Sequence, residues 1–265
     1  MRIVPIVILI MSGVLMPAPA SAQFRRLTEQ EQEQYAQAVK NGTRAEQAQA
    51  VGRIYAMGVA RQSGAELRSA LIEALEREVA LVEAQRGKNE PRDHPNMLEH
   101  LSSIVASFGD SSAIPALAGA ATSSLAAASG LAEFGEPAVA ALIETIDRQP
   151  DTTLVWTPMI ALRFLVEGAG GTPLSAQSVA RIRDVAKRYL DAPAGNSSVL
   201  TTAIDLAIAL NDPELRAVVE RIAADRSEVE ARGFDHPNDV ARIQKHAAER
   251  AAGKPAVPRH QRRTS

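Results

Sequence analysis

The polar feature with the clearest chemical potential is a tetrapeptide that occurs twice, as Asp93–Asn96 and as Asp235–Asn238, both reading Asp-His-Pro-Asn. Imidazole and carboxylate groups can bind a metal ion or take part in acid/base catalysis, and His100 lies close to the first copy. A helix start explains the same residues, because proline fits the first turn and a polar residue before it accepts an amide hydrogen bond. We favour the helix start, since two turns so far apart in sequence rarely form one three-ligand site.

Other patterns associated with catalysis are absent from the sequence. The chain contains no nucleophile elbow, phosphate-binding loop or metalloprotease helix. The run Gly168–Pro173, GAGGTP, begins like a dinucleotide-binding fingerprint, but its sixth residue is proline and no strand pattern precedes it. We interpret it as a loop. We therefore predict no catalytic residue, no cofactor and no metal ligand, and we favour a non-enzymatic protein while leaving the enzyme question open.

Helices must position these turns, and the segment Leu131–Gln149 shows how they begin and end. Gly135 follows an apolar run and supplies the permissive backbone that ends a helix, and Pro137 suits the first turn of the next one. The following apolar residues recur at i, i+3, i+4 and i+7, which places them on one helical face. These residues are Val139, Leu142, Ile143 and Ile146.

The same turn followed by a helix recurs along the chain. The stretches that begin at Gly64, Gly135 and Asn211 read GAELRSALIEAL, GEPAVAALIETI and NDPELRAVVERI and align without a gap. We expect a left-handed backbone at these three residues. Looser copies begin near Gly109 and Gly171. The alignment predicts core positions at Leu71, Leu142 and Val218, at Ile72, Ile143 and Val219, and at Leu75, Ile146 and Ile222, with Glu73, Glu144 and Glu220 facing solvent.

This pattern resembles HEAT-type repeats, particularly the short bacterial kind grouped with phycobilisome-lyase HEAT-like repeats, over roughly Thr43–Asp225. The resemblance implies an all-α fold, an α-solenoid of about five stacked antiparallel helix pairs, and a surface for binding another protein. In such arrays the second helix of each pair usually lines the concave side. We take the helix Ala65–Gln85 as the second helix of the first pair. The candidate partner-binding residues on such helices are Arg68, Glu73, Glu144, Arg216, Glu220 and Arg221. The alternative is that they are simply the solvated faces of amphipathic helices.

Composition restricts the possible functions of the 265 residues. Apolar residues make up 46% of the chain and aromatic residues only 3%, so we expect a core of Ala, Leu, Ile and Val. The Ala-rich segment Ala113–Leu131 predicts helices whose backbones lie close together. Interleaved aromatic residues and a basic groove are lacking, which argues against nucleic acid as a partner. The chain has no cysteine and therefore no disulfide.

Residues 1–22 have the composition of an export signal. Arg2 precedes the apolar run Ile3–Leu15, and Ala20–Ala22 is a small-residue cleavage site, so we expect cleavage after Ala22 and a periplasmic or secreted protein. A membrane anchor is the less favoured alternative, because this run is shorter than the roughly 20 residues that span a bilayer and prolines follow it. We predict no transmembrane segment after cleavage.

The rest of the chain divides into four predicted parts. Residues 23–42 form a polar helix that opens at a capping box, residues 43–225 form the repeat domain, and residues 226–252 form a charged helix. Residues 253–265 carry four cations and no acid, and we expect a disordered basic tail.

Our leading hypothesis is an exported, non-enzymatic HEAT-like scaffold that binds another protein. The alternatives are an enzyme or a small-molecule or metal binder that uses the histidine turns, and a structural component of the cell envelope.

Overall fold

The computed structural model describes residues 26–58, 62–88, 94–192 and 195–254. Within these ranges the chain is helical and contains no strand, so the prediction of an all-α fold is confirmed. The predicted export signal, residues 1–22, lies outside the described residues, as does the predicted tail beyond Lys254.

Thirteen α-helices and two short 3-10 helices make up the described ranges. The first seven α-helices are α1 (Glu29–Asn41), α2 (Arg44–Met57), α3 (Ala65–Ala84), α4 (Met97–Ala106), α5 (Ile114–Ala120), α6 (Leu125–Glu133) and α7 (Glu136–Arg148). The others are α8 (Trp156–Val166), α9 (Ala176–Asp191), α10 (Ser197–Ala209), α11 (Pro213–Ala224), α12 (Arg226–Glu230) and α13 (Pro237–Ala251). The 3-10 helices are η2 (Ser111–Ala113) and η3 (Thr152–Leu154).

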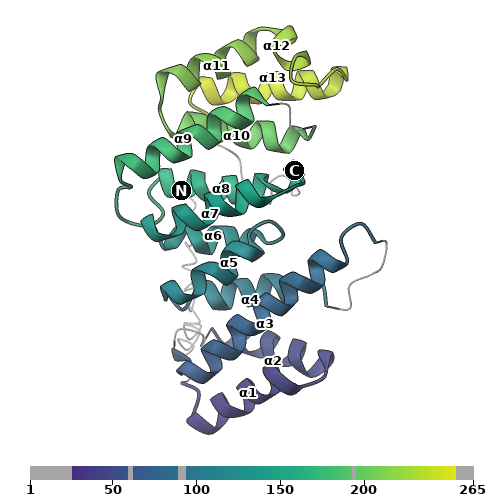
Figure 1. Cartoon of the computed structure of the whole chain (residues 1–265), viewed down its shortest axis with the longest axis vertical. Coiled ribbons are helices and arrows are strands. Elements are labelled where there is room, and N and C mark those ends of the chain that lie inside the picture. The colour runs from purple at the N-terminus through teal and green to yellow at the C-terminus, as the bar shows by residue number, and fades with distance from the viewer. Residues whose placement is uncertain (1–25, 59–61, 89–93, 193–194, 255–265) are drawn as a thin grey trace, which may run out of the picture.

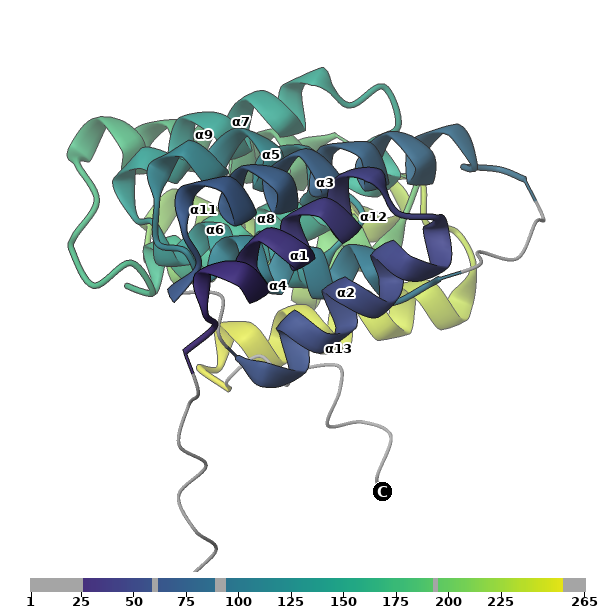
Figure 2. The same cartoon turned by 90° about the horizontal axis from the view of Figure 1, so that it is seen from below.

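The helices pack as pairs in two layers. The pairs are α1/α2, α3/α4, α5/α6, α7/α8, α9/α10 and α11/α13. Neighbouring pairs contact each other through equivalent helices, so that α1, α3, α5, α7, α9 and α11 form a first layer and α2, α4, α6, α8, α10 and α13 form a second layer. Figure 1 shows the pairs following one another along the long axis with the first layer in front. Figure 2, seen from below, shows both layers curved in the same sense, with α1 and α11 below α5 and α7, and α2 and α13 below α6 and α8.

This pairing corrects one expectation from the sequence. Helix α2 packs against α1 and α4, whereas α3 packs against α1, α4 and α5, so α2 and α3 do not form the first pair. Helices α3, α7 and α11 are therefore the first helices of their pairs. The helix α1, which the sequence sets apart as a polar helix, packs on α2 and α3 and contributes buried Ala36 and Val39.

Helix starts follow the local sequence closely. The predicted capping box is present at α1, where Thr28 pairs with Glu31, and Thr43 and Glu46 form a second one at α2. The amide and hydroxyl of Thr43 donate to the Glu46 carboxylate and lower the pKa of that group.

The predicted left-handed turn residues behave differently from one another. Gly135 has φ 67° and Asn211 has φ 53°, as expected for residues that reverse the chain after a helix. The expectation was wrong for Gly64, whose φ of −69° and ψ of 167° are those of an extended N-cap. Its turn therefore differs from that of the other two copies.

The three aligned copies place most of their apolar residues in the core. Leu75, Ile146 and Ile222 are buried at the third aligned position, as predicted. At the other two positions Ile72 and Val218 are only half-buried. The alignment without a gap therefore predicts burial correctly in all three copies at the third aligned position, but not at the other two. The outward-facing glutamates of all three copies, Glu73, Glu144 and Glu220, are exposed, as predicted.

Side chains from one helix also fix the first turn of the equivalent helix in the next pair. The Glu99 carboxylate on α4 accepts hydrogen bonds from Ser124 Oγ at 3.0 Å and from the Ala126 amide at 3.1 Å, at the start of α6. The Ala126 amide is one of the backbone amides that have no hydrogen-bond partner within the helix at a helix start. Glu99 thereby connects successive pairs in the second layer.

Glu136 makes the corresponding connection in the first layer. Its carboxylate on α7 accepts hydrogen bonds from the Ser178 hydroxyl and from the amide and hydroxyl of Ser175, the N-cap of α9. These bonds favour the ionised carboxylate, so the pKa of Glu136 is lowered, with the Ser178 hydroxyl as the largest cause.

Two glycines allow backbones to approach closely. A Cβ atom added at Gly130 on α6 would lie 2.2 Å from Ala106 Cβ on α4. A Cβ atom added at Gly170 would lie 2.5 Å from Gly135 Cα, so the loop that the GAGGTP run forms rests on the turn between α6 and α7. The close backbone approach expected of the Ala-rich segment is thus present at Gly130.

Candidate functional site

The candidate partner-binding residues named from the sequence all lie in the first layer, on three helices. Arg68 and Glu73 lie on α3, Glu144 lies on α7, and the other three candidates, Arg216, Glu220 and Arg221, lie on α11. Helix α5 lies between α3 and α7, and α9 lies between α7 and α11. The structure therefore distributes the six residues along the layer and does not bring them together in one patch.

Two of these residues bond to the protein's own backbone. Arg68 Nε donates to the Ser63 carbonyl at 2.8 Å, and its guanidinium lies 5.3 Å from the centre of the Phe108 ring. Arg216 Nη1 donates to the Ala251 carbonyl at the end of α13, at 3.3 Å. Both side chains are half-buried, and we assign them to internal packing.

The other four candidates are exposed. Glu220 forms no ion pair with any described residue. The remaining three interact only with nearby side chains, and an exposed pair of this kind stabilises the fold by roughly 0.2–0.5 kcal/mol. These partners are Ser69 for Glu73, Arg148 for Glu144, and Glu228 for Arg221.

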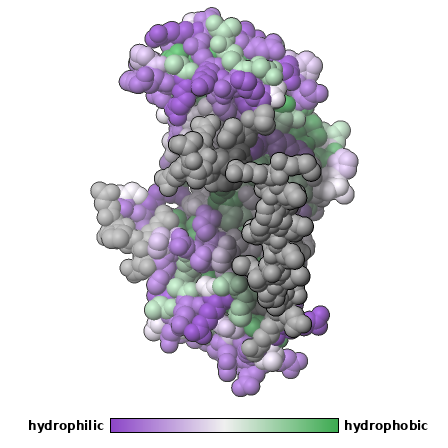
Figure 3. All heavy atoms as spheres, turned by 180° about the vertical axis from the view of Figure 1, so that it is seen from behind, coloured by the Kyte–Doolittle hydropathy of each residue, from purple (hydrophilic) through white to green (hydrophobic). Residues whose placement is uncertain are grey.

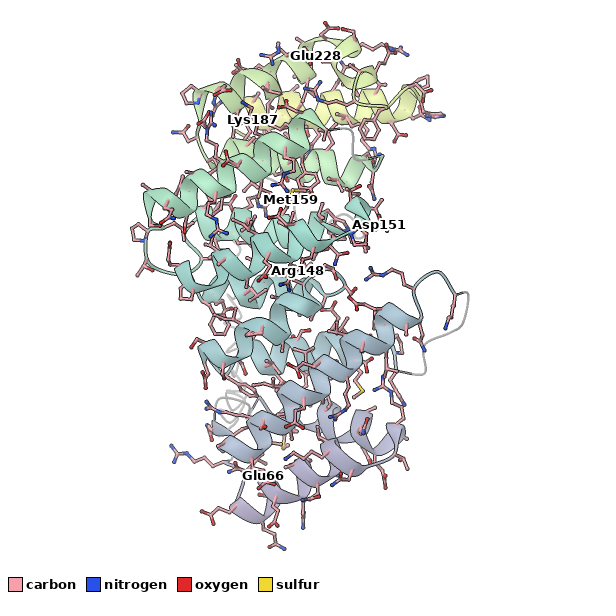
Figure 4. The ribbon with its side chains drawn as sticks, in the orientation of Figure 1. Glu66, Arg148, Asp151, Met159, Lys187 and Glu228 are labelled. Atoms are coloured by element: carbon pink, nitrogen blue, oxygen red, sulfur yellow. The ribbon has the colours of Figure 1, made fainter. Side chains whose placement is uncertain are left out.

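Several other charges of the first layer are paired between helices. Arg188 on α9 pairs with Asp147 on α7, and Arg183 on α9 donates to Asp212, the N-cap of α11, at 2.7 Å. The Asp212 carboxylate raises the pKa of Arg183, and the guanidinium lowers the pKa of Asp212. Figure 4 shows Lys187, a further cation of α9 whose Nζ lies 3.2 Å from Glu214 on α11. Several charges of α7, α9 and α11 are therefore paired with one another, although Glu220 is not.

The outer face of the second layer is different, because apolar and small residues dominate its middle. On α8, Trp156, Ile160 and Phe164 recur at i, i+4 and i+8 and are each half-buried; we call these three residues the apolar ridge. The adjacent helices present small residues on either side of the ridge, and these are Ala126 and Ser129 on α6 and Ser198 and Thr201 on α10.

Two further exposed apolar side chains belong to this face. Leu125 at the start of α6 is 45% exposed. Tyr55 on α2 is 47% exposed and stacks on His100 of α4, with ring centres 4.2 Å apart. We call the apolar ridge together with Tyr55, His100, Leu125, Ser129 and Thr201 the second-layer face. Figure 3 views the molecule from this side and shows hydrophilic residues concentrated over the end formed by α11, α12 and α13.

A cluster of charges lies beside the apolar ridge, where α8, α10 and α13 meet. Asp205 Oδ1 lies 2.9 Å from His246 Nε2 and 2.8 Å from Arg250 Nε, and its Oδ2 lies 3.3 Å from Arg163 Nη1. Arg250 is nine-tenths buried. A buried guanidinium requires a counter-charge, so Asp205 fixes the last long helix to two earlier ones. Sequence reasoning missed this cluster, because its members are about forty residues apart and share no motif.

Both histidine turns precede helices, but only the second has the predicted form, with Pro237 in the first turn and a side-chain cap; at the first, Asn96 precedes α4 without a side-chain cap. His236 Nδ1 accepts a hydrogen bond from the Asn238 amide at 3.3 Å and caps α13. At the first copy the Met97 amide donates to the His94 carbonyl at 3.1 Å and α4 begins, while Asp93 lies outside the described residues.

Their positions do not support a shared metal site. Helices α4 and α13 have α6, α8 and α10 between them in the second layer, which at 8–10 Å per helix separates the turns by roughly 35 Å. Among the described residues no group of three His, Cys, Asp or Glu side chains is arranged to hold a metal ion.

A shallow cleft of about 330 Å³ lies beside the second histidine turn, where three loops meet. Several of the polar side chains around it are bonded within the protein. Asn196 accepts from the Ser198 amide, and Arg242 donates to both Ser197 and Asp239. We assign these groups to holding the loops together.

None of the described helices is both long and apolar enough to cross a membrane. Comparison with family models, with curated proteins and with solved structures gave no match to this chain. The second-layer face and the Asp205 cluster are therefore interpreted from their own geometry.

Proposed function

We propose that this chain is a HEAT-like α-solenoid of stacked antiparallel helix pairs, exported from the cytoplasm, that binds another protein and is not an enzyme. The support for the fold is the arrangement of contacts, in which each helix packs on its partner and on the equivalent helix of the next pair. The support for export is the composition of residues 1–22.

The observation that carries the binding proposal is the contrast between the two layers. The first layer carries many charges from α7 to α11, several of them paired between helices, whereas the middle of the second-layer face has few charges and carries the apolar ridge. Protein-binding surfaces lose charged residues and gain aromatic ones at their centres. In HEAT-type arrays the concave side is usually formed by the second helix of each pair, and here those helices form the second layer.

The Asp205 cluster gives this surface a rigid edge. Because Arg163 stands next to Phe164 on α8 and pairs with Asp205 on α10, the ridge is held by the same contacts that fix α13. A rigid surface reduces the conformational entropy that association would cost.

The proposal is tested by placing charges on each layer and measuring binding. Leu125→Lys and Ser129→Lys change the second-layer face at side chains that are not fully buried, and Val179→Lys changes an exposed apolar residue of α9 in the first layer. The unchanged protein is used to capture a partner from envelope and secreted fractions, and the captured protein is then titrated against each variant. We expect saturable binding with defined stoichiometry that the second-layer variants lose and Val179→Lys keeps.

Loss of binding in Val179→Lys alone would refute the choice of layer. The sequence-based candidates make the competing prediction, and Glu73→Lys, Glu144→Lys and Glu220→Lys test it. Export is tested separately, because N-terminal sequencing of the protein from the envelope fraction should begin at Gln23. Intact residues 1–22 in that fraction would contradict the expected cleavage after Ala22.

A further inference from the structure

A cleft of about 520 Å³ lies between α1 and α2, at the outer end of the row of helix pairs. Figure 2 looks onto this end and shows α1 and α2 next to each other, with no other described helix in front of them. Small-molecule sites in proteins occupy roughly 300–1,000 Å³. The cleft is therefore large enough to hold a small ligand.

Two helical stripes face each other across this cleft. On each helix the lining residues recur at i, i+3, i+4 and i+7, which is the spacing of one helical face. The third residue of each stripe is an alanine, so small side chains form the floor and longer polar side chains form the walls. A span of seven residues at 1.5 Å per residue makes the cleft about 10 Å long. The stripes are Gln34, Gln37, Ala38 and Asn41 on α1, and Glu46, Gln49, Ala50 and Arg53 on α2.

Most polar groups of the walls are available to a ligand. Gln34, Gln49 and Arg53 are exposed, and their side chains have no hydrogen bond or ion pair with any described residue. Gln37 accepts a hydrogen bond from Asn41 Nδ2 at 2.7 Å through Oε1, which leaves its amide nitrogen unpaired among the described residues. The smaller cleft beside the second histidine turn differs, because several of its polar side chains bond to one another.

The acids of the cleft already have a structural role. The Glu46 carboxylate accepts hydrogen bonds from the amide and hydroxyl of Thr43, and the Glu31 carboxylate does the same for Thr28. Arg53 is the one basic residue that lines the cleft. The walls are therefore mainly amides, which both donate and accept hydrogen bonds and so match the hydroxyl groups of a ligand.

Apolar surface lies between these walls. Tyr35 and Ala38 are half-buried against the core, and Ala50 is 4% exposed. A saccharide has the matching chemistry, because its rings carry apolar C–H faces and hydroxyl edges. An extended peptide fits less well, since a floor of alanines offers no pocket for its side chains.

We propose that the cleft between α1 and α2 binds a short saccharide. The C–H faces of the sugar lie on Tyr35 and the alanine floor, and its hydroxyl groups exchange hydrogen bonds with Gln34, Gln49 and Arg53. The cleft lies on the first pair, whereas the apolar ridge lies on α8 of the fourth pair. The inference therefore does not require the proposed binding of a protein partner to be correct.

NMR titration of the isotopically labelled chain with cellobiose, maltose and N,N′-diacetylchitobiose tests the proposal. We expect at least one of these disaccharides to cause saturable amide shifts confined to α1 and α2. Gln49→Leu removes an amide from one wall and should raise the dissociation constant about tenfold, as expected for one or two lost hydrogen bonds. Gln177→Leu, at an exposed site on α9, is the control and should leave it unchanged. Absence of saturable shifts with all three disaccharides, or an unchanged dissociation constant in Gln49→Leu, would overturn the proposal.

A second variant tests the floor of the cleft independently of its amides. Ala38→Leu should fill the floor and abolish the shifts, whereas Ala180→Leu, at an exposed site on α9, should not. Urea unfolding of both variants verifies that they remain folded. Saturable binding that persists in folded Ala38→Leu would place the sugar elsewhere and refute the site. Tetraglycine is titrated in parallel, and shifts of the same amides by tetraglycine but by none of the disaccharides would identify a peptide site and refute the saccharide.

Discussion

The close contact between α4 and α6 predicts that Gly130→Ala destabilises the protein, although replacing glycine by alanine within a helix is usually stabilising. Gly130→Ala adds a Cβ atom 2.2 Å from Ala106 Cβ, whereas carbon atoms normally contact at about 3.5–4.0 Å. The two helices must therefore separate by at least roughly 1.3 Å. Overpacking of this kind costs about 1–3 kcal/mol, and a backbone-anchored Cβ atom cannot rotate away, which places the cost near the upper limit.

Helix propensity works in the opposite direction and provides the control. Alanine is about 1 kcal/mol more favourable than glycine within a helix, so Gly130→Ala should destabilise the protein by a net amount of about 2 kcal/mol. Gly119→Ala lies in the neighbouring α5, where the added Cβ atom would meet only Val79 Cγ1 at 4.0 Å. That variant should be more stable than the natural chain by about 0.5–1 kcal/mol.

Urea unfolding of the two variants, with hydrogen exchange at α4 and α6, measures both effects. A second substitution identifies the cause, because Ala106→Gly removes the atom that Gly130→Ala would meet and should recover most of the lost stability in the double variant. If Gly130→Ala were as stabilising as Gly119→Ala, or if Ala106→Gly gave no recovery, the close backbone approach of these helices would be refuted.

Three further predictions concern polar connections. Glu99→Ala should cost about 2 kcal/mol in urea unfolding, since it removes two charge-assisted hydrogen bonds at the start of α6, while Glu133→Ala on the exposed surface should change stability by less than about 0.5 kcal/mol. Because the pKa of Glu136 is lowered in the folded protein, its ionised form stabilises the fold at pH values above the unfolded pKa of about 4.3. The natural chain should therefore be more stable than Glu136→Gln at neutral pH, and this difference in unfolding free energy should shrink as pH falls through the lower folded pKa. A stability difference that does not depend on pH would contradict this prediction. Asp205→Asn leaves two largely buried guanidinium groups without their carboxylate and should cost about 3 kcal/mol, with α13 showing the largest increase in hydrogen exchange, and unchanged exchange there would exclude its role in fixing the helix.

Local signals in the sequence were sufficient to predict the helices. A capping box, a proline in the first turn and apolar residues at helical spacing each act within about four residues, so Thr28, Thr43 and Pro137 predict helix starts that the structure confirms. The all-α fold follows from many such signals together.

Those local signals did not predict which helices pack together as pairs. The connection between α2 and α3 and the connection between α3 and α4 each follow one helix and precede another, and no local sequence signal distinguishes a connection within a pair from one between pairs. The sequence therefore did not show that α4 packs back against α3. Assigning α3, α7 and α11 as second helices followed from that ambiguity, and it directed the search for a binding surface to the first layer.

The candidate site depends on contacts that no repeat unit contains. Arg163, Asp205 and His246 lie on three different pairs, and each alone reads as an ordinary polar residue of an amphipathic helix. The sequence does not separate the apolar ridge from the core, because Trp156, Ile160 and Phe164 share α8 with the fully buried Met159 and Leu162. The spacing of apolar residues alone cannot show which side of a mostly apolar helix faces solvent.

The second-layer face is therefore a property of the stacking rather than of any single helix. Its apolar ridge remains partly accessible because α8 lies between α6 and α10, whose outward side chains at Ser129 and Thr201 are small and do not cover it. Replacing Thr201 by Leu should cover part of the ridge without adding charge, and it should weaken partner binding while leaving urea unfolding nearly unchanged. The matched change Ala140→Leu, at an exposed site on α7 of the first layer, should affect neither quantity. If Thr201→Leu bound the partner as tightly as the natural chain does, the ridge would not be the surface that the partner contacts.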